Sequence, residues 1–416
     1  MLFKDVRKSV VYDLPPRTRL NFFQSAALLA VFGIGSIQNA FALQHRDVSG
    51  EKEWSSPALQ GSAGIGAFSE SWVDQAHTDP SLLARRRSNF ELEFANLSAS
   101  VSRDAVNTVV DTVQSLTNQT NQSNGTSAAQ ATVNALDKVR AVFGKSMTLQ
   151  AQSNFLSPRI GRVGIAPYAS ALFDASIDNA AWPKLDSMGG GYGGVLVSYA
   201  QIVKNDFDLG VSVRPGVGGF RGYEVDLSLL GDFLGTNAAT SSGSSPLNDL
   251  LEFPTAVYCP LDLALGWWVD KSTRIHAVSK NTFDASPLKT LSGSPGRLQS
   301  RLNLGVLREV AIPGSSLQSL HVASELQDLA GIKGGWNEFL LRLQWAAQYS
   351  ARLPFRQQTS LGLNVGMHSG YPVLSAHIDF IVFKFEFALS ARENGAYSGQ
   401  RPNRLMSTRL YSQIQF

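Results

Sequence analysis

Residues 371–390 read YPVLSAHIDFIVFKFEFALS and alternate between apolar and polar side chains in two successive segments. Successive side chains of a strand point to opposite faces, so each segment predicts a strand with one apolar and one polar face. In the first segment the apolar set is Leu374, Ala376, Ile378 and Phe380, opposed by Ser375, His377 and Asp379. In the second segment it is Ile381, Phe383, Phe385, Phe387 and Leu389, opposed by Lys384, Glu386 and Ser390. The phase slips by one residue between them, which predicts a tight turn or a bulge.

The same alternation recurs along the second half of the chain. Regular examples are residues 261–267, 302–306, 336–349 and 361–367. Less regular candidates are 90–101, 162–177, 191–203, 207–213, 222–230, the residues around His276, and 317–326. Turn-forming residues such as Lys204-Asn205-Asp206 separate them. The pattern predicts about fourteen antiparallel strands.

Two all-β architectures produce such strands. A soluble sandwich buries its apolar faces and exposes charged ones, whereas a transmembrane barrel exposes an apolar band and encloses a polar lumen. Here only 17% of residues are charged, and the polar faces carry mainly Gly, Ser, Asn and Gln, with Trp and Tyr near strand ends. These features favour a closed transmembrane β-barrel.

The last strand is the most specific signal for that fold. Residues 404–416 read RLMSTRLYSQIQF, in which Met406, Leu410, Ile414 and the terminal Phe416 share one parity. Closure requires the last strand to pair with the first, so that no backbone edge meets lipid. A terminal aromatic on such a strand resembles the signal by which outer-membrane barrels are recognised for assembly. The resemblance assigns that role to Leu410, Ile414 and Phe416 and implies the barrel-assembly machinery as a partner.

The N-terminus predicts export. Positive residues up to Arg19 precede an apolar stretch from Ala26 to Ile37 and an Ala40-Phe41-Ala42 site, which together are typical of a signal peptide. We expect residues 1–42 to be removed by cleavage after Ala42. An uncleaved membrane anchor is the alternative.

Three segments resemble the FadL-type outer-membrane barrels and their PorV-like and TraF-like conjugal-transfer relatives. Residues 61–84 read GSAGIGAFSESWVDQAHTDPSLLA, which is similar to the small-residue box and the Asn-Pro-Ala-Gly-Leu-Ala run of that superfamily. Here Asp79-Pro80-Ser81-Leu82-Leu83-Ala84 departs from the usual form of the run. Residues 361–372 and 393–402 resemble the last hairpin regions of the group. The resemblance implies an N-terminal segment or plug over 43–86 and a barrel over 87–416.

Between Arg103 and Lys145 the period changes to that of a helix. Val106, Val109, Val113 and Leu116 fall on one helical face, and a polar run at 117–127 precedes a second amphipathic stretch. We therefore expect an inserted helical hairpin over 103–146. It could plug the barrel, lie on the membrane surface, grip a partner, or only stabilise one end.

Several other classes of function find no support. A net charge of +3 with scattered Lys and Arg argues against nucleic acid, and the single cysteine excludes an internal disulfide framework. The six histidines show no metal-ligand spacing, and no nucleophile elbow, P-loop or dinucleotide motif is present. The glycine run at 189–194 predicts a flexible turn rather than a phosphate cradle. We therefore expect no enzyme, cofactor or metal.

The polar faces predict a lumen-lining charge network. Its members are Glu338, Arg342, His377, Asp379, Lys384 and Glu386. A charge that faces lipid near the midplane destabilises a barrel by roughly 2–4 kcal/mol, so we place these side chains inward.

The resemblance implies an outer-membrane protein, surrounded by outer-membrane lipids, that binds or transports a hydrophobic small molecule. A barrel that binds a protein partner in a secretion or conjugal-transfer apparatus is the alternative, and a general pore is a third. In the protein-binding alternative, the helical insertion and the loop at 235–249 would be docking elements.

Overall fold

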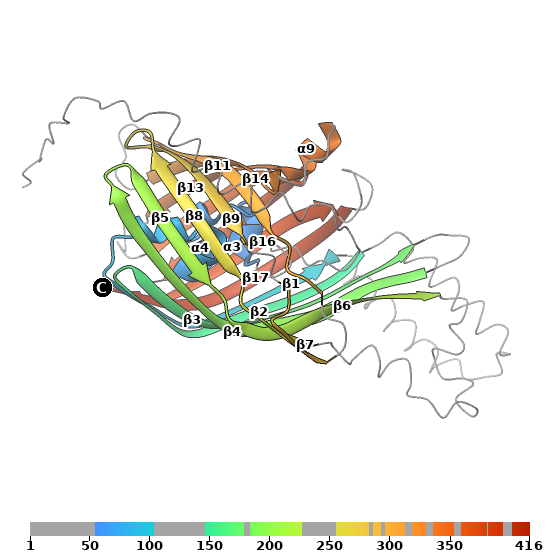
Figure 1. Ribbon diagram of the computed structural model, residues 1–416. Coiled ribbons are helices and arrows are strands. Elements are labelled where there is room, and N and C mark those ends of the chain that lie inside the picture. The colour runs from blue at the N-terminus through green and yellow to red at the C-terminus, as the bar shows by residue number, and fades with distance from the viewer. Residues whose placement is uncertain are drawn as a thin grey trace, which may run out of the picture.

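The computed structural model describes residues 55–103, 146–178, 184–226, 255–282, 286–292, 296–312, 318–329, 336–352, 359–380, 382–393 and 402–416. All of its strands belong to one antiparallel sheet that closes on itself (Figure 1). The strands are β1 (Phe90–Ser102), β2 (Ser146–Ile160), β3 (Val163–Asp178), β4 (Lys184–Lys204), β5 (Phe207–Val213), β6 (Gly216–Asp226), β7 (Thr255–Tyr258), β8 (Leu261–Trp268), β9 (Thr273–Lys280), β10 (Lys289–Ser292), β11 (Arg301–Val310), β12 (Gln318–Leu326), β13 (Leu343–Arg352), β14 (Thr359–His368), β15 (Tyr371–Phe380), β16 (Phe383–Glu393) and β17 (Pro402–Gln415).

The seventeen strand segments make a fourteen-stranded barrel, because three of the fourteen barrel strands are each divided into two segments. β5 and β6 both pair with β4, at different parts of its length. β8 then pairs with β5 and β7 with β6. In the same way β9 pairs with β8 and β10 with β7. Pro215 lies between β5 and β6, and Pro260 lies between β7 and β8. Proline has no amide hydrogen for the sheet, so each one ends a ladder at that point. The prediction of about fourteen strands in a closed barrel is confirmed.

Closure joins the two ends of the described chain. β1 pairs with β17, with Leu97 opposite Leu410, and β1 also pairs with β2. The amide of Phe416 donates to the carbonyl of Phe90 at 2.9 Å, and the amide of Asn89 donates to the carbonyl of Phe416 at 3.1 Å. The backbone edge of the last strand is therefore paired.

The alternation of burial follows the alternation of polarity, with polar side chains inside. On β14, Leu363 is 53% exposed on the outer face and its neighbour Asn364 is 1% exposed on the inner face. On β17, Leu410 is exposed and Arg409 is buried. An apolar outer face around a polar interior is the arrangement of a transmembrane barrel rather than a soluble one. The predicted tight turn between Phe380 and Phe383 is confirmed.

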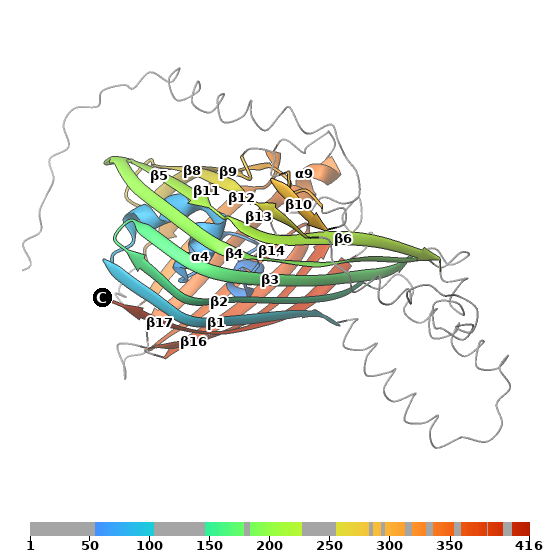
Figure 2. The ribbon, with the colours of Figure 1, turned by 60° about the horizontal axis from the view of Figure 1, so that its bottom comes forward.

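A short N-terminal segment lies inside the barrel, as the blue ribbon shows in Figures 1 and 2. It comprises the helices α3 (Pro57–Gly61), η1 (Gly66–Phe68), α4 (Trp72–Thr78) and η2 (Pro80–Arg85). α3 packs against β15, β16 and β17, whereas η2 packs against β4, β5 and β8. We call residues 55–85 the plug, because this segment spans the interior between walls on both sides.

Trp72 anchors the plug to the wall. Its ring is fully buried, and its indole Nε1 donates to the carbonyl of Ser157 in β2 at 3.2 Å. The inward face of Gly164 in β3 leaves the space for this ring, since a Cβ there would lie 2.4 Å from Cζ3 of Trp72. Close packing in protein interiors explains why one added methyl group would matter here.

Three predictions about local structure need correction. Residues Trp336–Arg342 form the helix α9, so only the second half of the predicted strand at 336–349 is extended. The glycine run at 189–194 lies inside β4 and not in a turn. It pairs with residues 216–221 of β6, and a Cβ at Gly194 would lie 2.3 Å from the carbonyl oxygen of Pro215. The strands β2, β7 and β10 were not predicted.

Other predictions lie outside the described residues. These are the signal peptide at 1–42, the helical insertion between 104 and 145, the loop at 235–249 and most of the turn at 393–402. Within the described residues, no helix is both long and apolar enough to cross a membrane.

Candidate functional site

The helix α4 presents a carboxylate at the centre of the lumen. Ser71 caps the helix by accepting from the amide of Asp74 at 3.3 Å, and Asp74 lies in the first turn, where a negative charge is favourable. The apolar residues Trp72, Val73 and Ala76 of the same helix are buried. The sequence SWVDQAHT therefore places an apolar face and one buried acid on a two-turn helix.

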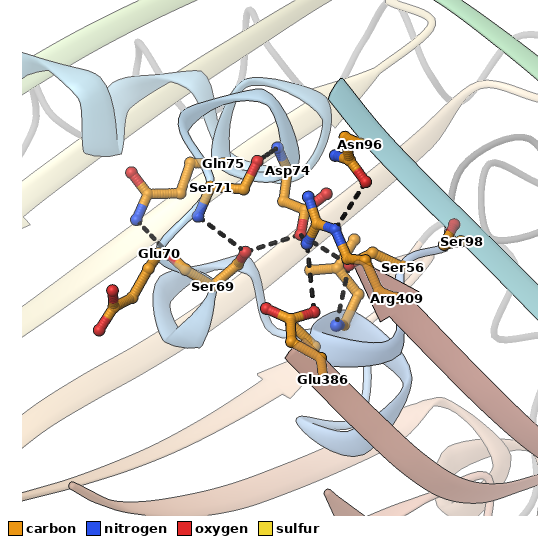
Figure 3. Close-up of polar contacts among 12 residues, drawn as sticks. Ser56, Ser69, Glu70, Ser71, Asp74, Gln75, Asn96, Ser98, Glu386 and Arg409 are labelled. Atoms are coloured by element: carbon orange, nitrogen blue, oxygen red, sulfur yellow. Dashed lines mark hydrogen bonds and ion pairs between the residues drawn. The ribbon is translucent and has the colours of Figure 1, made fainter. Parts of the chain in front are cut away.

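Asp74 is held from three sides (Figure 3). Ser56 Oγ and Ser69 Oγ each donate to Asp74 Oδ2 at 2.6 Å, and Arg409 Nη1 donates to the same oxygen at 2.7 Å. Both side chains of the Asp74–Arg409 pair are fully buried. Hydrogen bonds to a charged group are among the stronger ones, so this cluster fixes the plug against β17.

Arg409 joins two wall strands to the plug. Its Nε donates to Asn96 Oδ1 of β1 at 2.8 Å, and its Nη1 lies 3.3 Å from Glu386 Oε2 of β16. Its guanidinium also lies over the ring of Tyr411, 4.2 Å from the centroid. Arg409 points inward because it shares the parity of Ser407 and Gln413 on β17. The wall strand that closes the barrel is therefore one of the strands that hold the plug.

The structure brings together four of the six side chains predicted to line the lumen. His377 and Asp379 of β15 face Glu386 and Lys384 of β16, as the register pairs them. All four are buried, and Lys384 Nζ forms an ion pair with Asp379 at 3.7 Å and a second with Glu70 of the plug. Glu70 was not predicted, because the sequence pattern of a strand says nothing about what a separate segment brings to it.

The other two predicted residues lie elsewhere. Arg342 is at the end of α9, where its Nη1 pairs with Asp328 and not with the β15–β16 group. Glu338 is also in α9, but its side chain is outside the described residues. The helix, which the strand pattern did not predict, is the reason that Arg342 does not join the group.

Glu70 lies between η1 and α4 and is ionised in this setting. Partial desolvation by the surrounding protein would by itself raise the pKa of its carboxyl, but the charge of Lys384 and the hydrogen bond from it lower the pKa to about 2. His377 and Arg86 add smaller effects in the same direction. The Glu70 carboxylate therefore gives the plug a negative charge at neutral pH.

Further ion pairs fasten the plug at its other end. Asp79 Oδ2 lies 2.9 Å from Arg274 Nη1 of β9, and Arg85 Nε lies 2.8 Å from Asp208 Oδ1 of β5. Arg86 is 2.8 Å from Glu91 of β1. The Asp79-Pro80 motif therefore sits at a contact with the wall, with Asp79 also accepting from the amide of Ser81 at 3.1 Å.

One side of the lumen is apolar. Buried residues from β3, β4, β6 and β7 form one apolar cluster with residues of α4 there. We call Tyr168, Leu172, Tyr192, Phe220 and Tyr258 the aromatic wall. The ring of His77 lies edge-on to Tyr168 at 4.8 Å, and the rings of Tyr168, Tyr192 and Tyr258 follow at 5.7 and 5.9 Å.

Two hydroxyl groups of the aromatic wall donate to backbone carbonyls. Tyr258 Oη donates to the carbonyl of Gly296 at 2.6 Å, and Tyr192 Oη donates to the carbonyl of Arg214. A buried tyrosine usually satisfies its hydroxyl in this way, which leaves the ring faces free for apolar contacts. The lumen therefore has one large apolar side, whereas most of the other buried inward side chains are polar.

The residues predicted to signal barrel assembly lie at the seam. Leu410 is 53% exposed on the outer face opposite Leu97, and Phe416 is 77% exposed at the end of β17. The ring of Phe416 lies 6.0 Å from that of Phe90. Recognition of these residues by an assembly machinery stays a prediction.

The chain matches no protein-family model, and a search among curated proteins finds no match. Among solved structures it is similar to the toluene transporter TbuX of Ralstonia pickettii, at 11% identity over 88% of this chain and 99% of that one, with a TM-score of 0.44. It is also similar to the toluene transporter TodX of Pseudomonas putida, at 9% identity over 89% and 98%, with a TM-score of 0.41. The monoaromatic hydrocarbon channel CymD gives 11% identity over 87% and 97%, with a TM-score of 0.43. Values this low assign neither a family nor a substrate to the present chain.

Proposed function

We propose that this chain is an outer-membrane barrel that binds a hydrophobic small molecule and passes it through the plugged lumen. The aromatic wall is the observation that carries the proposal. Most inward side chains of the barrel are polar, yet this side of the lumen presents contiguous rings and aliphatic groups. A site for an apolar ligand requires an apolar lining with few polar groups, and this surface supplies contiguous apolar side chains.

The position of the plug favours transport of the ligand over binding alone. Trp72, Val73 and Ala76 of α4 cover the aromatic wall, while ion pairs hold the same helix and its neighbours to the polar side. A small displacement of the plug along the aromatic wall would expose apolar surface to a ligand without opening a wide aqueous pore. The fold thus favours passage of apolar molecules over general conductance.

Binding can be tested on the protein purified in a mild detergent. The fluorescence of N-phenyl-1-naphthylamine rises in an apolar site, so its titration reports the affinity of the aromatic wall for a neutral aromatic probe. We expect saturable binding that weakens in Phe220→Ser and in Leu172→Ser. The matched control is Ser170→Ala, which alters a polar inward residue on β3, the strand of Leu172. Saturable binding that is equal in all four proteins, or none at all, contradicts the proposal.

Mass spectrometry of the same preparation separates ligand transport from a scaffold role. Co-purified apolar small molecules support transport, whereas a stoichiometric protein partner without them supports the scaffold alternative.

Transport itself is tested by uptake of the probe into cells that carry the wild-type or the Phe220→Ser protein. Fractionation, together with the mass of the mature N-terminus, tests the outer-membrane location and cleavage after Ala42.

A further inference from the structure

Three potential metal ligands meet where the plug touches β15. Glu70 of the plug and His377 and Asp379 of β15 each offer one ligand atom, and these atoms all lie within 4.8 Å of one another. The sequence predicted no metal site, because two of the ligands are two residues apart on a strand and the third lies about 300 residues earlier. Only the fold brings the carboxylate of Glu70 to this place.

His377 is held in the group without a hydrogen bond to its Nε2. The side chain is 8% exposed, and Nε2 is buried with no hydrogen-bond partner. Its ring leans over Gly362 of β14, where a Cβ would lie 1.9 Å from Cε1. A buried polar atom without a partner destabilises the fold, and one ring nitrogen of this imidazole lies within 4.8 Å of two carboxylate oxygens, so the side chain calls for a function.

The charge of the group is not balanced. Glu70 and Asp379 share the single ammonium of Lys384, while the next carboxylate, Glu386, pairs with Arg409. The group therefore offers two carboxylates and one imidazole to a cation, with a single ammonium as the counter-charge. Zn²⁺ and Co²⁺ favour this combination of one nitrogen and two oxygen ligands.

We propose that Glu70, His377 and Asp379 bind a divalent transition-metal cation that bridges the plug and the wall. Ligands about 2.1 Å from a tetrahedral zinc ion lie about 3.4 Å apart, so the three atoms must close by roughly an ångström. Glu70 can supply the movement, because its side chain is 46% exposed and it lies outside a helix. Asp379 is already oriented by Ser360 Oγ, which donates to its Oδ2 at 2.5 Å. Such second contacts fix a ligand for a metal.

Lys384 is then the competitor of the metal. Its ammonium pairs with the same two carboxylates and lies 5.7 Å from the centroid of the Tyr411 ring. A cation that enters the group displaces this ammonium. Removal of the Lys384 charge should therefore tighten metal binding, which is the opposite of what a structural defect would do.

The experiment uses the full mature chain without an affinity tag, folded in detergent and stripped of metal with a chelator. Zn²⁺ binding is measured by calorimetry, and the visible spectrum of bound Co²⁺ reports coordination by nitrogen and oxygen. We expect one ion per chain, at least a tenfold loss of affinity in His377→Ala, Asp379→Asn and Glu70→Gln, and a gain in Lys384→Met. His321→Ala, on β12 of another part of the wall, serves as the matched control.

The difference in electrophoretic mobility between heated and unheated samples shows whether each variant retains a folded barrel. Gly362→Ala provides a second test, because it displaces the His377 ring without removing a ligand and should also weaken binding. No stoichiometric binding to the wild-type chain overturns the proposal. Equal affinity in wild type and His377→Ala, or in wild type and Glu70→Gln, overturns it as well. The outcome is independent of whether the barrel transports an apolar ligand.

Discussion

Arg409 of the closing strand and Asp74 of the plug form an ion pair in which Nη1 and Oδ2 are 2.7 Å apart and both side chains are inaccessible to solvent. The two residues are 335 positions apart in the chain. The pair therefore couples two events, namely closure of the barrel by β17 and seating of the plug. A defect in either residue should affect both.

Replacement of Arg409 by leucine tests this coupling. The change leaves Asp74 and Glu386 buried without their cation, and loss of one partner of a buried pair typically destabilises a protein by about 3–5 kcal/mol. We expect the denaturant midpoint of barrel unfolding, followed by gel mobility, to fall accordingly. Arg404→Leu is the control, since Arg404 is exposed on the same strand. Equal midpoints for the two variants would show that the pair does not hold the barrel.

Gly164→Val should displace the plug from the wall. The new side chain would overlap the ring of Trp72, which lies 2.4 Å from the position of a Cβ at Gly164. Overpacking of this kind costs about 1–3 kcal/mol, and here the plug can relieve it by moving. We expect a larger steady conductance in planar bilayers. Gly193→Ala, whose Cβ would meet only the carbonyl of Tyr168 at 3.7 Å, should conduct like the wild type.

Leu363→Arg tests the direction of the apolar face. Leu363 is exposed in the middle of β14, and an arginine that faces lipid near the midplane costs about 2–4 kcal/mol. The same substitution at Val203, which is exposed near the end of β4, should cost about 0–1 kcal/mol because it lies closer to the interface. Folding titrations into lipid vesicles measure both. If the two variants fold with the same free energy, the outer face does not lie against acyl chains.

The Asp79–Arg274 contact predicts a specific dependence on pH. Burial alone would raise the pKa of Asp79, but the charges of Arg274 and His276 and the hydrogen bonds from Arg274 and Ser81 lower it overall. A carboxyl with a lowered folded-state pKa stabilises the protein above its unfolded value of about 3.9, and this stabilisation is lost as the pH falls through the folded-state pKa.

We therefore expect the difference in unfolding free energy between wild type and Asp79→Asn to stay constant from pH 7 to about 5 and to shrink below about 4. Denaturant unfolding at a series of pH values measures it. Asp206→Asn, at an exposed position in the turn between β4 and β5, is the control for general acid effects. A difference that grows as the pH falls would contradict the assigned direction.

The sequence predicted the wall of this protein far better than its interior. The alternation of residues 371–390 predicted two strands separated by a turn or a bulge, and the described side chains of β15 and β16 face the predicted sides. It placed His377, Asp379, Lys384 and Glu386 on one face, because the period of a strand is fixed by local backbone geometry. The same rule failed for residues 336–342, where an alternating pattern forms a helix.

The sequence by itself determined an all-β chain whose strands have one apolar and one polar side, since both properties follow from neighbouring residues. Only the tertiary structure decided which inward side chains meet the plug, and therefore that Asp74 reaches Arg409, Glu70 reaches Lys384, and an aromatic wall covers α4. These contacts join residues hundreds of positions apart. Their partners are chosen by strand register and barrel closure, which no local pattern of side chains encodes.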